Sequence, residues 1–122
     1  MIEAIEYNQW NAYFRGFNLR NRWRPTRLEV LSEAGAREAE RGMPLVGISL
    51  EADREGSLRI HIMLGDHDAI DPRHQTFTIT GVRRVTPRGG INDLDEALEI
   101  EDEQGDKNLL RFEPLPSVCQ IR

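Results

Sequence analysis

Cysteine is nearly absent from this sequence, because Cys119 is the only one among 122 residues. No intrachain disulfide can form, and a zinc site built from several thiolates is excluded within one chain. No apolar run reaches the roughly 20 residues that a membrane-spanning helix needs. The first residues also lack the basic start and the apolar core of a signal peptide. These absences predict a cytoplasmic protein with no membrane partner, in which Cys119 is an inert or partly exposed thiol.

Basic residues are fewer than acidic ones, with 16 lysines and arginines against 21 aspartates and glutamates. A chain with this balance is not steered as a whole toward nucleic acid or anionic membranes. Catalytic motifs are missing too, since there is no phosphate-binding glycine loop, dinucleotide fingerprint or serine elbow. The length and the apolar fraction of 39% suit one globular domain over residues 1–122. We therefore expect a single domain without a cofactor.

A period of two runs through residues 45–112, where apolar residues alternate with polar ones in short runs. Successive side chains of a strand point to opposite faces, so this alternation predicts a sheet with one buried face. The segment Asp53–Gly56 has the composition of a hairpin turn, and Gly81 marks a bulge or a sharp bend. The expected strands cover residues 26–32, 45–52, 57–64, 75–86, 97–102 and 108–112.

The segment from Glu33 to Met43 fits neither a helical nor a strand pattern clearly. Its alanines, glutamates and arginines favour a helix, whereas Gly35 and Gly42 weaken that interpretation. We predict a loop that contains one or two helical turns, with Pro44 at the start of the following strand.

Large aromatic side chains recur at spacings of three, four and three near the N-terminus, at Tyr7, Trp10, Phe14 and Phe17. This spacing puts them on one face of a helix. Asn8 is a candidate cap for its start, and Gly16 and Asn18 predict an end nearby. The stripe is expected to pack onto the sheet, although a platform for ligand stacking is the alternative. The predicted fold class is α+β, with an N-terminal helix packed on a curved, mostly antiparallel sheet of about six strands, open or closed into a small barrel.

Candidate metal ligands gather in one predicted loop, at Asp66, His67, Asp68, Asp71 and His74. Carboxylates and imidazoles suit divalent transition metals. His61, on the preceding strand, is expected to point away from the face of Ile60 and Ile62, toward solvent. The loop matches neither the calcium-binding pattern nor the histidine pair of a zinc hydrolase helix. It is either a hydrated loop or a metal site with His67, Asp66, Asp68 and His74 as ligands.

Arginines are concentrated in the stretch Arg15–Arg27, where no acidic residue intervenes. Arg20, Arg22 and Arg24 lie beside Trp23 in this stretch. Guanidinium groups for phosphates and an aromatic ring for base stacking are typical of single-strand nucleic-acid sites. The alternative is that arginines near a helix end bind its last carbonyls and cover apolar surface with their stems.

Acidic residues are concentrated near the C-terminal end, at Asp93, Asp95, Glu96, Glu99, Glu101, Asp102, Glu103 and Asp106. Glycosidase chemistry needs two carboxyls that face each other across a cleft, which a row along one strand does not supply. Glu99 and Glu101 instead share the outward face of an expected strand. Such a row either blocks unwanted edge pairing or is recognised by a basic partner, for example the arginine stretch of a second copy.

Several short motifs together resemble a known family. They are Trp10 with Phe14, Met43-Pro44-Leu45-Val46-Gly47-Ile48, Ile62-Met63-Leu64-Gly65, Leu98-Glu99-Ile100-Glu101, Gly105 and Leu110-Arg111-Phe112. From Trp10 to Phe112, this series is similar to a family of small bacterial proteins known only as a domain of unknown function. The resemblance implies one coherent domain. It implies no activity, ligand or site residue, because these motifs are strand cores and turns.

The function that the sequence favours is a non-enzymatic protein-interaction module that works through an exposed sheet surface or edge. Its partner is then another protein or a second copy of the chain, rather than nucleic acid. Two alternatives stay open. One is nucleic-acid binding through the stretch Arg15–Arg27, and the other is a metal-dependent enzyme that uses the loop around His67.

Overall fold

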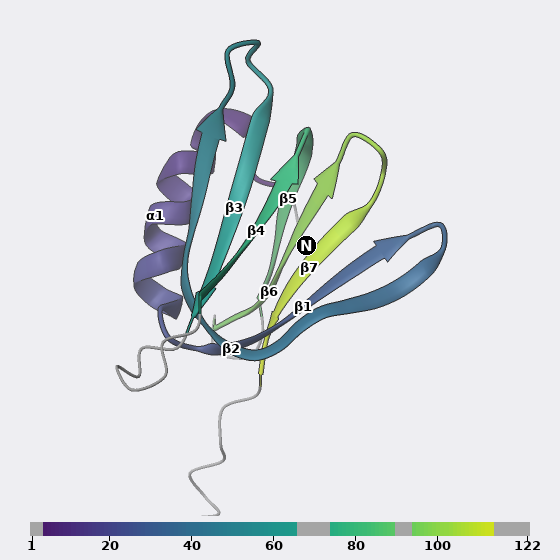
Figure 1. Cartoon of the computed structure of the whole chain (residues 1–122). Helices are drawn as coiled ribbons and strands as arrows, with labels where there is room; N and C mark the ends of the chain where they lie inside the picture. Colours follow the sequence, from purple (N-terminus) through teal and green to yellow (C-terminus); the bar gives the residue numbers. More distant parts are fainter. Residues whose placement is uncertain (1–3, 66–73, 90–93, 114–122) are drawn as a thin grey trace, which may run out of the picture.

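The computed structural model describes residues 4–65, 74–89 and 94–113. Seven strands form one antiparallel sheet in the order β4-β3-β2-β1-β7-β6-β5. The sheet curls into a half-barrel, and helix α1 packs against it (Figure 1), which confirms the expected helix on a curved antiparallel sheet. In chain order the elements are η1 (Tyr7–Gln9), α1 (Trp10–Asn21), β1 (Pro25–Ser32), β2 (Gly35–Ala52), β3 (Leu58–Gly65), β4 (His74–Thr80), β5 (Val82–Gly89), β6 (Asp95–Asp102) and β7 (Lys107–Phe112).

The break predicted at Gly81 is confirmed, and it divides one expected strand into β4 and β5. Gly81 has a φ of +63°, in the left-handed region that favours glycine. Although β4 and β5 are consecutive in the chain, they lie at opposite ends of the sheet order. The bend at Gly81 therefore leads the chain from one edge of the curled sheet to the other. It also raises the number of strands from the expected six to seven.

The prediction of a loop with helical turns over residues 33–43 is wrong. Glu33 and Ala34 form a tight turn, and from Gly35 onward the chain runs antiparallel to β1 as the first half of β2. Gly35 suits the end of this turn because its φ is +117°. Helix propensity is a weak preference, and here the ladder with β1 and the packing of Ala39 against the core outweigh it.

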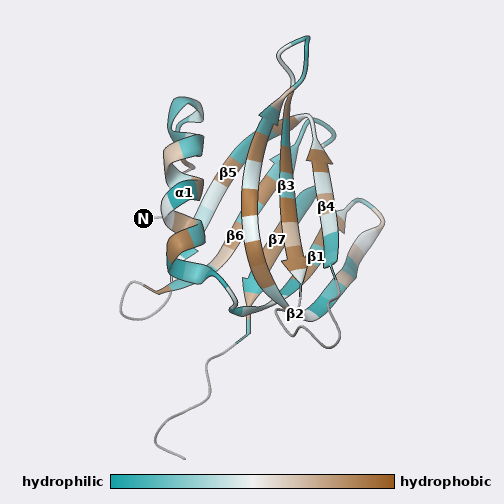
Figure 2. Ribbon diagram, turned by 60° about the vertical axis from the view of Figure 1, so that its left-hand side comes forward, coloured by the Kyte–Doolittle hydropathy of each residue, from teal (hydrophilic) through white to brown (hydrophobic). Residues whose placement is uncertain are grey.

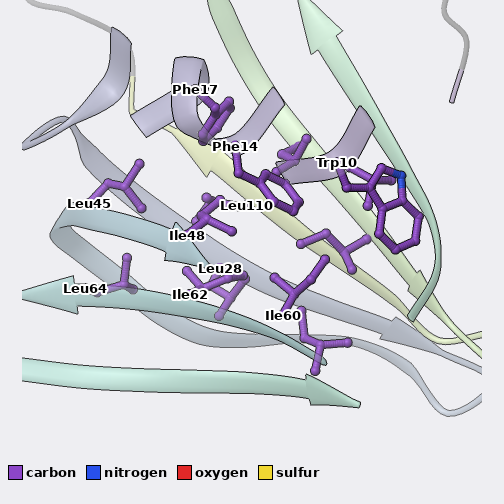
Figure 3. Close-up of a cluster of buried hydrophobic side chains, with 14 of the residues drawn as sticks. Trp10, Phe14, Phe17, Leu28, Leu45, Ile48, Ile60, Ile62, Leu64 and Leu110 are labelled. Atoms are coloured by element: carbon purple, nitrogen blue, oxygen red, sulfur yellow. The ribbon is translucent and has the colours of Figure 1, made fainter. Parts of the chain in front are cut away.

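The aromatic stripe is confirmed at three of its four positions. Trp10, Phe14 and Phe17 are buried and point from α1 toward the sheet (Figure 3). Tyr7 lies before α1, in η1, and its side chain is exposed, so its place in the buried stripe was wrongly predicted. Asn8 also lies in η1 and does not cap α1, whose preceding residue is Gln9. The helix runs past Gly16 and Asn18 to Asn21, one turn further than expected.

The core lies between α1 and the inner face of the sheet. Ile48, Ile60 and Ile100 are no more than 2% exposed, which confirms the predicted sorting of the alternating residues. Apolar and polar residues alternate along β2 and β3 in Figure 2, as this sorting requires. Within the described ranges, no helix is long and apolar enough to cross a membrane.

Candidate functional site

The loop proposed to hold a metal lies largely outside the described residues. Four of its candidate ligands fall outside the described ranges, namely Asp66, His67, Asp68 and Asp71. Two other residues named from the sequence, Asp93 and Cys119, also fall outside these ranges. His74 is the exposed first residue of β4 and pairs with Gly65. In the part of the chain that the structure describes, no three histidine, cysteine, aspartate or glutamate side chains are grouped to hold a metal ion. Metal binding by this loop stays a prediction.

Two arginines of the basic stretch are bound within the molecule by one aspartate. Arg20 donates from Nε to Oδ2 of Asp95 at 2.7 Å and from Nη2 to Oδ1 at 3.2 Å. Arg24 donates from Nη1 to the main-chain oxygen of Asp95 at 2.9 Å and to Oδ1 of Asn21 at 2.8 Å. The buried Asn21 donates to Oδ2 of Asp95 at 2.8 Å. These four residues, the Asp95 network, fasten the end of α1 to the start of β6.

The electrostatics of the Asp95 network are those of a structural ion cluster. Burial alone would raise the pKa of Asp95, but the hydrogen bonds from Arg20 and Asn21 and the charges of Arg20 and Arg24 outweigh it and lower that pKa. Burial lowers the pKa of Arg24, whose guanidinium carbon lies 4.2 Å from the centroid of the Phe112 ring. Both guanidinium groups are held beside the Asp95 carboxylate, whose negative charge opposes the approach of a phosphate. For Arg20 and Arg24, the structure therefore supports the alternative in which these arginines stabilise the fold near the end of the helix and do not bind nucleic acid.

Arg22 and Trp23 lie on the surface beside this network. The Trp23 residue is 42% exposed, and the guanidinium carbon of Arg22 lies 6.0 Å from its ring centroid. Trp23 has a φ of +71°, which is uncommon outside glycine, and its main-chain N–H donates to the oxygen of Leu45 at 2.7 Å. The unusual backbone thus supports a contact between the α1–β1 connection and β2. Nucleic-acid binding through these two residues stays a prediction.

The acidic row on β6 is paired with arginines of β5. Glu99 pairs with Arg88 at 2.8 Å, and Glu101 pairs with Arg84 at 3.6 Å. The two carboxylate side chains are only 12% and 17% exposed. The arginine stretch of a second copy would have to displace both arginines to reach these carboxylates. Glu99 and Glu101 therefore find within their own chain the basic partners that were predicted to come from a second copy.

A row of three polar side chains crosses the outer face of β2, β3 and β4. His61 contacts Oε1 of Glu51 through Nε2 at 2.9 Å and Oγ1 of Thr78 through Nδ1 at 2.9 Å. The imidazole hydrogen bond and the charge of Arg59 lower the pKa of Glu51. His61 thus points away from Ile60, as predicted. Its two partners could not be predicted from local sequence patterns, because they become neighbours only through the strand register.

This row has the order of groups found in nucleophilic relays, namely carboxylate, imidazole and hydroxyl. Such relays also need hydrogen-bond donors aimed at a developing oxyanion and a site that excludes water. Here the Glu51 side chain is 54% exposed, and Thr78 is exposed on the outside of the sheet. The arrangement therefore ties three neighbouring strands together and gives no support to acyl-transfer chemistry.

The long strand β2 changes partners along its length. Residues 35–44 pair with β1, whereas residues 45–52 pair with β3. In the second half, the edge that β1 has left is covered by main-chain bonds of Leu45 to Trp23 and Arg24 at 2.7 and 2.9 Å. The Asn18 side chain adds two bonds to Ile48, accepting from its N–H at 2.8 Å and donating to its oxygen at 2.9 Å. This half of β2 is therefore protected by α1 and the segment after it.

The first half of β2 is left open on the side away from β1. No strand within the described ranges pairs with residues 36–41 on that side, and we call this segment the β2 edge. In Figure 1 the hairpin of β1 and β2 projects from the rest of the sheet. Gly35 and Gly42, with φ of +117° and +86°, bracket the β2 edge.

A hollow lies at the end of the β2 edge, where β2 passes the start of β4. Its volume is about 460 Å³. Met43 and Pro44 give it an apolar lining, and His74 adds a polar side chain from β4. The complete lining consists of Glu40, Arg41, Gly42, Met43, Pro44, His74 and Gln75. A main-chain edge and an adjoining hollow together form the strongest candidate site in the described part of the molecule.

No family model matches this chain, and no curated protein or solved structure is significantly similar to it. The resemblance to a domain of unknown function stays a prediction.

Proposed function

We propose that this protein is a non-enzymatic interaction module that binds an extended segment of a partner along the β2 edge. The observation that supports this proposal is the stagger of β2, which leaves residues 36–41 paired only with β1 among the described strands. An unpaired edge presents N–H and C=O groups at fixed spacing, and an incoming strand can bond to them. Main-chain bonds then supply affinity, and pockets for side chains supply specificity.

The direction of the main-chain groups follows from the hairpin register. Ser32 and Gly35 flank the turn, and the pair that flanks such a turn exchanges hydrogen bonds. Bonded and non-bonded pairs then alternate along an antiparallel ladder. The N–H groups of Ala36 and Glu38 therefore point away from β1. Both residues are exposed, so an incoming strand can reach these donors.

The hollow beside β4 is placed to read one side chain of the bound segment. A strand that follows the β2 edge past Arg41 comes to the lining of the hollow. Met43 and Pro44 would contact apolar atoms of the partner, and His74 and Gln75 offer hydrogen-bonding groups. This combination of apolar surface and a few polar groups is typical of peptide-binding pockets.

The experiment uses a random-peptide display library selected on the full chain. Selected peptides are expected to slow deuterium exchange at the amides of Ala36 and Glu38. Binding should be lost in Glu38→Pro, because proline removes the outward N–H without removing a bond to β1. Glu38→Gln is the matched control, since it removes the charge and keeps the N–H.

The proposal is overturned if the selected peptides protect amides elsewhere, or if Glu38→Pro binds them as well as Glu38→Gln does. Circular dichroism verifies that both variants are folded. If Glu38→Pro does not fold, the exchange pattern of the wild-type chain decides alone.

A further inference from the structure

We infer that the β2 edge pairs with the β2 edge of a second copy of this chain, in an antiparallel register that places Arg37 of each copy opposite Glu40 of the other. This inference rests on the proposed function and names the partner. The charges along the edge carry it. Residues 37–41 read Arg-Glu-Ala-Glu-Arg. Ala39 is the extra residue of a bulge, so residues 39 and 40 together take one position of the edge, and a two-fold axis through Glu38 then brings Arg37 opposite Glu40.

The charges select among the possible registers. In the register of the proposal, Arg37 meets Glu40 twice, because the two-fold axis repeats every pair. An axis through Arg37 would instead place Arg37 opposite its own copy, and an axis through Ala39 would place Arg37 opposite Arg41 and Glu38 opposite Glu40; like charges directly opposite destabilise a strand pair. An axis through Glu40 would place Glu38 opposite Arg41. These two side chains already pair within one chain at 3.1 Å, so that register gains less.

The two residues that meet across the proposed interface are available for it. Arg37 is exposed and has no ion pair among the described residues. The Glu40 carboxylate accepts a hydrogen bond from the main-chain N–H of Arg41 at 3.0 Å. That contact also shows that the Arg41 N–H points away from β1, since a side chain rather than the ladder receives it.

Pairing of two copies would exchange these contacts without leaving a group unsatisfied. In the proposed register Arg41 lies opposite Ala36 of the second copy, so its N–H can donate to that main-chain oxygen. The Glu40 carboxylate is then released to meet Arg37 of the second copy. In the single chain, the Glu40 carboxylate thus accepts the hydrogen bond that the second strand would accept in the dimer. Because the bulge at Ala39 lets residues 39 and 40 share one position, Glu38 lies opposite its own copy on the two-fold axis. Each of these two carboxylates keeps the ion pair with Arg41 of its own chain at 3.1 Å.

Sedimentation of the full chain over about 1 µM to about 1 mM, at low salt, tests the inference, because a short paired edge binds weakly. We expect a concentration-dependent change from monomer to dimer. Arg37→Glu and Glu40→Arg should each weaken dimerisation by about tenfold or more, since each creates two like-charge pairs. The double variant Arg37→Glu/Glu40→Arg restores both pairs with the charges exchanged, and it should restore the dimer.

The outcomes separate this inference from the proposed function. A wild-type chain that stays monomeric throughout, or a double variant that stays as weak as the single ones, overturns the second copy as partner. In that case selected peptides that still require the N–H of Glu38 leave strand addition standing. A dimer that is as strong in Glu38→Pro as in the wild type overturns the β2 edge as its interface. All variants are compared by circular dichroism, and exposed Leu19→Ala serves as the matched substitution elsewhere.

Discussion

At the scale of single residues, the aromatic side chains of α1 carry much of the stability. Phe14 is 2% exposed and lies among core side chains of the sheet (Figure 3). We expect Phe14→Ala to lower the free energy of unfolding by about 3–5 kcal/mol, because it removes a ring and leaves a cavity. Urea denaturation measures this change. Leu19→Ala, on the exposed side of the same helix, should stay within about 0.5 kcal/mol of the wild type. A Phe14→Ala variant as stable as Leu19→Ala would revive the alternative of a ligand-stacking platform.

Asp95 is the second residue whose contribution can be measured separately. Its folded-state pKa is lowered, so its charge stabilises the fold fully above the unfolded pKa of about 4, and this contribution is lost as the pH falls through the folded pKa. We expect Asp95→Asn to lower the free energy of unfolding by about 1–2 kcal/mol at pH 7, a modest value because the carboxylate is partly exposed. The stability difference from wild type should shrink as the pH falls below about 4.

Denaturation curves at several pH values measure this dependence, with the exposed Glu96→Gln as control. A difference between Asp95→Asn and wild type that is constant from pH 7 to pH 2 would contradict the assigned charge network. The sequence predicted that arginines near a helix end could serve the fold. It could not identify Asp95 as their partner, since the contact joins residues 75 positions apart.

At the scale of elements, local sequence patterns predicted the strands whose apolar and polar residues alternate. They missed the first half of β2, where the residues do not alternate in this way. The hairpin of β2 and β3 is confirmed, and the strands expected over residues 97–102 and 108–112 are present and pair through Leu98 and Leu110, because each has alternating side chains and a short turn. Residues 33–43 lack that alternation, since this half of β2 is mostly exposed. Their composition favours a helix, and only the neighbouring strand β1 decides otherwise. The candidate site lies in this same segment, so local sequence patterns could not locate it.

The joint between β4 and β5 gives a test at this scale. Gly81 has a φ of +63°, and a Cβ added there would lie 3.0 Å from the Glu103 carboxyl carbon. We expect Gly81→Ala to cost about 1–3 kcal/mol, from left-handed backbone strain and from this close approach. Thermal denaturation measures the loss.

The double variant Gly81→Ala/Glu103→Ala separates the two causes. Removal of the Glu103 side chain relieves the close approach and leaves the backbone strain, so the double variant should be more stable than the additive expectation from the two single variants. Strict additivity would show that the Glu103 side chain moves away at no cost. A Gly81→Ala variant as stable as wild type would contradict the bend at this position.

At the scale of the whole molecule, the packing of α1 decides which part of β2 is covered. The helix covers the open side of the second half of β2 through Asn18, whereas β4 and β5 are the end strands of the sheet order. The first half of β2 has no comparable cover in the described part of the chain. This contrast arises from the stagger between β1 and β3 along one long strand. It is a property of the assembled sheet, and no local pattern in the sequence encodes it.

The same architecture predicts that helix and sheet unfold together. One core cluster joins α1 to side chains of every strand, so removal of the helix would expose the inner face of the whole sheet. The variant Trp23→Phe leaves the buried Trp10 as the only tryptophan and makes fluorescence a reporter of helix docking. Its urea transition followed by fluorescence should coincide in midpoint and slope with the transition followed by far-ultraviolet circular dichroism, which reports the secondary structure of the whole chain. A fluorescence transition at lower urea would mean that α1 detaches while the strands stay paired. In that case the core would belong to the sheet alone, and the protection of β2 by Asn18 would be a weak, separable contact.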